Sequence, residues 1–163
     1  MNWYSCAAMS LCVLAASCSS TPTVPDDPQS RLAAIQPAID SVPASGLGPQ
    51  ELKSGECGVF LWSQTDVSKF IFFSKALSGS AVFAQGRQPM RLTQSGVGGE
   101  IFGQFNTRME YVANDGRVVS LDLVPGDMLE GGQRIESGLL TLADREGWLT
   151  KLPVLGVRAC QRE

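Results

Sequence analysis

The side chains of this chain that could do chemistry are its five cysteines, its carboxylates and its serines. Histidine is absent from all 163 residues. Without an imidazole the chain has no Ser-His-Asp or Cys-His pair, no histidine ligand for a metal and no proton switch near neutral pH. We therefore predict that it is not an enzyme and that it has no catalytic residue, metal site or cofactor.

Two carboxylate pairs remain as candidates for acid–base work, Asp122 with Asp127 and Glu130 with Glu136. Alternation along VVSLDLV places Asp122 on the solvent-facing side of a strand, and Glu130 falls in a polar loop. No serine stands in a Gly-x-Ser-x-Gly elbow. We interpret these carboxylates as solvated surface.

The glycine-rich segment 96–103 has the composition of a phosphate-binding loop but not its pattern. The third glycine of a GxGxxG motif would fall on Ile101, and Gln104 stands where a P-loop lysine belongs. We interpret the segment as a flexible hairpin loop or a β-bulge.

The cysteines near the start of the chain lie in a distinctive setting. Residues 7–17, AAMSLCVLAAS, form an uncharged and largely apolar run of signal-peptide length, short of the ~20 residues that an apolar helix needs to cross a bilayer. Small residues then precede Cys18: Ala15, Ala16 and Ser17. This arrangement resembles the signal of bacterial lipoproteins, although Leu14 lies one place farther back than the usual leucine and MNWYS carries no Lys or Arg.

The resemblance implies that residues 1–17 are a cleaved signal peptide and that Cys18 is lipidated and becomes the new amino terminus. It also implies an outer-membrane protein facing the periplasm rather than an inner-membrane one, because Ser19 instead of an acidic residue follows the cysteine. The alternatives are an ordinary cleaved signal, with Cys18 as a bystander, and a retained membrane anchor.

Cysteine arithmetic agrees with this assignment. Cleavage would remove Cys6 and Cys12, and lipid would occupy Cys18, which leaves Cys57 and Cys160. In an oxidising compartment we expect those two to form a disulfide that joins the first predicted strand to the last. A two-thiol metal or redox site is the alternative, but no CxxC spacing supports it.

Residues 18–56 are interpreted as a lipid-anchored tether. SSTPTVPDDP is polar and proline-bearing, as is typical of a solvated linker. An apolar helical stripe follows and is interrupted by Pro37; its members are Leu32, Ile35, Ile39 and Val42. We interpret this part as a short or kinked helix, expected to pack on the folded domain, or as extended linker.

Residues 57–163 have the pattern of a β-domain. Seven or eight short β-rich runs alternate with turn signals, among them Asn114-Asp115-Gly116, which favours a tight hairpin. We predict an all-β fold, a small antiparallel meander closed as a barrel or folded as a sandwich. Such a barrel is just wide enough for side chains or one small ligand.

Aromatic residues supply the remaining candidates. Trp62 and Trp148 could flank a ligand cleft, or close the core of the barrel near strand ends. Residues 70–73, FIFF, are apolar on both strand faces, which is typical of a strand buried on both sides; an exposed partner patch is the alternative.

Charge and composition narrow the partners. A net charge of -3 gives no basic footprint for nucleic acid. A lipid-anchored β-domain with one disulfide resembles in outline the bacterial lysozyme-inhibitor lipoproteins. Ser95-Gly96 is followed here by Val97-Gly98-Gly99, and no tyrosine appears until Tyr111, so no inhibitory residue is carried over.

We therefore expect a monomer, held at the membrane by lipid on Cys18, that serves as a structural or protein-interaction module for another envelope protein. The alternative is a small-ligand-binding barrel or an inhibitor of a lysozyme-like enzyme. A filled interior with an apolar outer patch favours the first reading, and a void or mouth lined by Trp62 and Trp148 favours the second.

Overall fold

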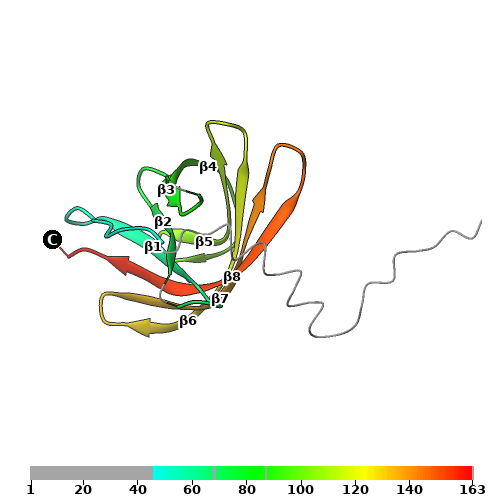
Figure 1. Ribbon diagram of the computed structural model, residues 1–163. Helices are drawn as coiled ribbons and strands as arrows, with labels where there is room; N and C mark the ends of the chain where they lie inside the picture. The colour runs from blue at the N-terminus through cyan, green and yellow to red at the C-terminus, as the bar shows by residue number, and fades with distance from the viewer. Residues whose placement is uncertain (1–45, 68, 87, 163) are drawn as a thin grey trace, which may run out of the picture.

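The computed structural model describes residues 46–67, 69–86 and 88–162. Eight antiparallel strands follow one another around a closed barrel, and β1 completes the circle by pairing with β8 (Figure 1). The strands are β1 (Cys57–Ser63), β2 (Phe70–Lys75), β3 (Ser80–Phe83), β4 (Met90–Phe102), β5 (Phe105–Ala113), β6 (Val118–Leu129), β7 (Gly132–Ala143) and β8 (Leu149–Cys160). The all-β prediction is confirmed, and of its two forms the barrel is the one present. Cys18 and the predicted helix lie outside the described residues.

Every second residue of most strands faces the interior, which these side chains fill. In β6, Val119 and Leu121 are buried while Ser120 and Asp122 face outward, as alternation predicts. The ring of Tyr111 in β5 meets that of Phe72 in β2 edge-on at 5.3 Å between centroids. Because β2 and β5 are not neighbours in the barrel, this contact spans the interior.

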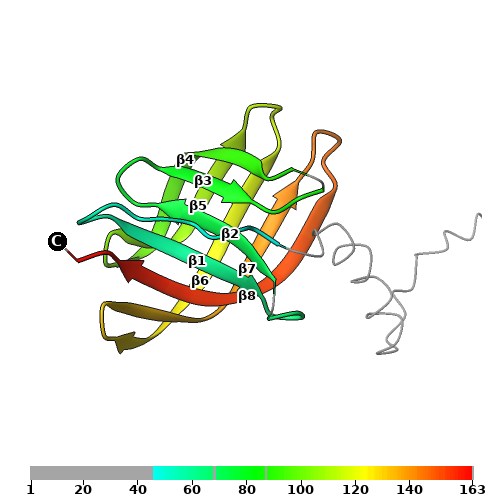
Figure 2. The ribbon, with the colours of Figure 1, turned by 60° about the vertical axis from the view of Figure 1, so that its left-hand side comes forward.

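The segment 46–56 runs along the outer wall over β1 and β2 (Figure 2). The Leu47 amide donates to the Phe70 carbonyl at 2.6 Å, and the side chains of Leu47 and Leu52 pack against the core cluster. Phe73, which points outward from β2, is buried beneath this cover. Residues 71–73 are buried on both faces of β2, as predicted, whereas Phe70 is half-buried. The described folded body thus includes residues 46–56, which the sequence assigned to the tether.

The glycine-rich part of the chain is strand rather than loop. β4 continues through it, and its pairing with β5 shifts register between Gln94 and Gly96 and again between Gly98 and Ile101. Gly99 adopts a φ of 72°, a left-handed conformation that suits a bulge. The bulge interpretation is therefore the correct one. The turn to β5 comes later, at residues 103–104.

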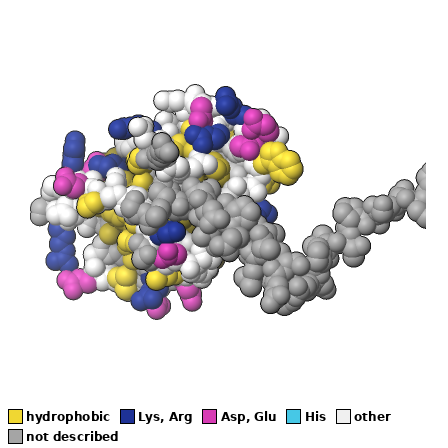
Figure 3. All heavy atoms as spheres, viewed as in Figure 1, with side chains coloured by type: hydrophobic (Ala, Val, Ile, Leu, Met, Phe, Trp, Pro, Cys, Tyr) yellow, Lys and Arg dark blue, Asp and Glu magenta, His cyan; other side chains and the backbone are white. Residues whose placement is uncertain are grey.

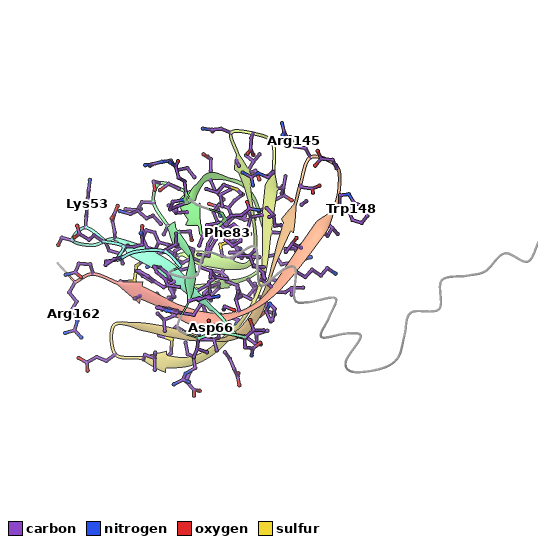
Figure 4. The ribbon with its side chains drawn as sticks, viewed as in Figure 1. Lys53, Asp66, Phe83, Arg145, Trp148 and Arg162 are labelled. Atoms are coloured by element: carbon purple, nitrogen blue, oxygen red, sulfur yellow. A yellow bond between two sulfur atoms is a disulfide. The ribbon has the colours of Figure 1, made fainter. Side chains whose placement is uncertain are left out.

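The turns are divided between the two ends of the barrel. One end, here called the disulfide end, carries the Cys57–Cys160 bridge together with the β2–β3, β4–β5 and β6–β7 turns. The opposite end carries the other four turns, including the predicted Asn114-Asp115-Gly116 hairpin, where Gly116 has a φ of 87°. Labelled residues at the two ends lie on opposite sides of Figure 4: Lys53 and Arg162 against Arg145 and Trp148.

Candidate functional site

The two cysteines assigned to the folded part are bridged. Cys57 and Cys160 are direct partners in the β1–β8 register, with an S–S distance of 2.04 Å. The bridge fastens the seam at which the first strand meets the last. It therefore serves the closure of the barrel.

Trp62 lies on the outer wall of the barrel. Its neighbours Leu61 and Ser63 face the interior, so alternation turns the indole outward. The indole packs on Phe70 at 5.0 Å between centroids, and the Phe70 ring continues to Phe60 at 6.0 Å. Trp62 thus ends a row of half-buried aromatic rings on the outside of β1 and β2, and it does not close the core.

A groove of about 330 Å³ hollows the outer wall beside this row. It is here called the Trp62 groove, and its lining residues are Trp62, Leu129, Arg134, Ile135, Glu136, Leu155, Gly156 and Val157. Leu155 is the direct partner of Trp62 across β1 and β8, so the two side chains stand together on one wall. Gly156 forms part of the floor, where an added methyl group would overlap the Phe60 carbonyl.

Trp148 occupies a different part of the molecule. It lies in the β7–β8 turn with 76% of its surface exposed, and its amide donates to the Asp144 carboxylate at 2.8 Å. It lies seven positions before Leu155, which at about 3.3 Å per residue places it roughly 23 Å along the chain from the partner of Trp62. The two tryptophans therefore do not flank one cleft, and Trp148 does not close the core.

A second concavity, of about 440 Å³, lies on the outer wall of β4, β5 and β6. Gly96 and Gly98 leave the sheet bare there, opposite Glu110 and Arg108. Asp122 lines it as well and is exposed, as predicted. The lining combines one cation, Arg108, with two carboxylates, Glu110 and Asp122, on an open surface.

The remaining carboxylates also belong to the surface. Asp127, Glu130 and Glu136 are exposed, and Glu130 pairs with Arg162 at 3.0 Å. Figure 3 shows acidic and basic side chains interspersed over the visible face. Within the described ranges, no group of three or more cysteine, aspartate and glutamate side chains could hold a metal ion.

Among the described residues, three groups have a displaced pKa, and each displacement has a structural cause. The Lys53 amide and the Lys75 ammonium lower the pKa of Glu56, and the Arg117 guanidinium lowers that of Asp115. Burial raises the pKa of Tyr111 to about 12, and the hydroxyl lies 3.4 Å from the Met109 sulfur. These groups stabilise turns and core, and none of them faces the Trp62 groove.

Sequence reasoning overlooked Arg158. Its side chain points into the barrel at the disulfide end and is only 8% exposed. The sequence contained a signal for this placement. In β8, Arg158 lies at every-second-residue spacing from Leu152, Val154, Gly156 and Cys160. If Cys160 faces the interior, Arg158 must face it too.

Comparison with known proteins identifies no relative of this chain. No family model, curated protein or solved structure matches this chain. In the described part of the chain no helix is long and apolar enough to span a membrane.

Proposed function

We propose that this chain is a bacterial envelope lipoprotein, anchored through Cys18, whose barrel is an interaction module for another envelope protein. The observation that carries the proposal is an apolar groove on the outer wall of a barrel whose interior is occupied by its own side chains. A barrel that carries a small ligand in its interior needs open space there, whereas an interaction module needs an exposed groove.

The chemistry of the Trp62 groove favours a protein as its occupant. Its wall of Trp62, Leu155 and Val157 is aromatic and aliphatic, and Arg134 and Glu136 provide one charge of each sign. An apolar centre with a charged rim is the usual anatomy of a protein interface, and tryptophan and arginine are the residues that most often dominate binding there. A polyanionic partner would instead require an excess of cations.

The anchor suits this role. We expect the tether predicted for residues 18–45 to let the barrel stand clear of the bilayer, because a random-coil chain of that length spans a root-mean-square distance of roughly 30 Å. Two or more acyl chains on Cys18 would hold it stably, because a single chain binds only marginally. The barrel would then meet partners close to the membrane surface.

Anchoring is tested by metabolic labelling with a fatty-acid analogue. The protein should incorporate the label, and Cys18→Ser should abolish it and leave the precursor uncleaved. Cys12→Ser is the matched control and should keep the label. An unlabelled mature protein whose first residue is not Cys18 would refute the anchor.

The interaction is tested with a photo-crosslinking residue in the full-length protein in its own envelope. A crosslinker at Leu155 should capture a discrete protein, whereas one at Val112, on the outer face of β5, should not. Trp62→Ala should reduce the crosslink at least tenfold, as expected for a hot-spot residue, and Trp148→Ala should leave it unchanged. Equal yields from the two positions, capture of glycan alone, or crosslinking only to the chain's own residues 18–45 would each overturn the proposal.

A further inference from the structure

Arg158 is a cation enclosed at the disulfide end of the barrel. Only 8% of its surface is exposed, and a guanidinium stays protonated in proteins. Within the described residues no carboxylate pairs with it. Its Nη1 donates to Gln104 Oε1 at 3.3 Å and lies 3.5 Å from the Cys160 sulfur, while its buried Nε has no hydrogen-bond partner.

The local backbone is shaped around this guanidinium. Gly103, in the β4–β5 turn, has a φ of 64°, and a methyl group added there would overlap the guanidinium atoms of Arg158. The cation is therefore held between the turn and the Cys160 side chain. Since a buried charge without a counter-charge is costly, this position calls for an anion.

A cavity of about 310 Å³ adjoins the enclosed cation. Its lining includes Arg158, Cys160 and Arg162, together with Gly131 and Gly132, which take up little space. No acidic residue lines it. Arg162 stands at the rim in an exposed ion pair with Glu130, the two side chains being 75% and 89% exposed, and such surface pairs are weak. Arg162 is thus able to turn toward a bound anion.

We infer that this cavity binds a phosphate group between Arg158 and Arg162. Guanidinium groups match phosphate oxygens with paired hydrogen bonds. Once Arg162 leaves Glu130, two arginines in a lining without an acidic residue suit a doubly charged phosphate monoester better than a single carboxylate. Met128 and Leu129, also in the lining, offer an apolar flank to whatever bears the phosphate.

The test is a titration of the full-length protein in neutral detergent with inorganic phosphate, against chloride at equal ionic strength. Phosphate should bind at one site and raise the melting temperature in proportion to its occupancy. Arg158→Met should weaken binding by about tenfold or more, the loss expected for a charged hydrogen-bond donor, and Arg162→Gln should weaken it less. Arg145→Gln, at the opposite end of the barrel, is the matched control and should bind as the unaltered protein does.

Arg158→Met also separates a binding role from a structural one. It removes the enclosed charge but keeps similar bulk, so in chloride its melting temperature should equal or exceed that of the unaltered protein. The inference is overturned if Arg158→Met melts at a lower temperature in chloride and phosphate does not raise the melting temperature of the unaltered protein. Arg158 would then be a structural residue. If Arg158→Met does not fold, two other outcomes overturn the inference. One is that Arg162→Gln binds phosphate as tightly as the unaltered protein, and the other is that the unaltered protein does not bind phosphate.

The source of the phosphate is resolved by two further ligands. Dihexanoyl phosphatidic acid binding at least tenfold more tightly than glycerol 3-phosphate would assign the site to a lipid head group, with Met128 and Leu129 against the acyl chains. Equal affinities would assign it to a free phosphate ester. Both outcomes support the site, and neither depends on a partner at the Trp62 groove.

Discussion

At the scale of single residues, Tyr111 shows how enclosure changes a side chain. Its phenol is 1% exposed, and burial raises its pKa to about 12 from the usual 10. Below pH 10 the phenol keeps its proton in both the folded and unfolded states. Between pH 10 and 12 the unfolded state releases it and the folded state does not, so we expect the free energy of unfolding to fall across that window by about 3 kcal/mol. Tyr111→Phe should not show this fall in the free energy of unfolding between pH 10 and 12, as measured by urea unfolding at a series of pH values. Identical pH profiles for the two proteins would contradict the assignment.

At the scale of elements, β4 and β5 form a long ribbon, and the second of its two register shifts contains Gly99. Gly99 has a φ of 72°, and a methyl group there would overlap the Thr107 hydroxyl, which accepts the Glu100 amide at 2.9 Å. We expect Gly99→Ala to lower the free energy of unfolding by about 1–3 kcal/mol, the cost of a left-handed non-glycine residue. Gly98→Ala is the adjacent control: its methyl group meets Arg108 only at 3.8 Å, so the change should stay within about 0.5 kcal/mol. If urea denaturation shows the same loss of unfolding free energy for Gly99→Ala and Gly98→Ala, the left-handed conformation at the bulge is not the cause of the loss.

At the scale of the whole molecule, stability depends on the seam between β1 and β8. The Cys57–Cys160 bridge closes a loop of 103 residues, which in the chain-entropy model stabilises by about 4.7 kcal/mol at most. The double variant Cys57→Ala/Cys160→Ala should melt more than about 10 °C lower. It should keep a β-type circular dichroism spectrum at room temperature, because the β1–β8 ladder remains. Reductant should reproduce this drop in the unaltered protein and have no effect on the variant. Free thiols in the native, unreduced protein would contradict the bridge.

The sequence by itself determined the local features of this protein. A period of two along VVSLDLV, turn residues such as Asn114-Asp115-Gly116 and the leftover pair Cys57 and Cys160 were enough to predict a β-meander with one bridge. These signals are local because alternation and turn chemistry depend on neighbouring residues alone.

Only the tertiary structure decided which face of each strand is inside. Alternation shows which residues of a strand share a face, but not which of the two faces lies inside the barrel. Each register shift in β4, β6 and β7 also exchanges the inward-facing and outward-facing positions along the strand. Trp62 is therefore found outside and Arg158 inside only once β1 has paired with β8. Closure likewise separates Trp62 from Trp148, and it creates the open cavity beside Arg158, because these relations join residues far apart in the chain.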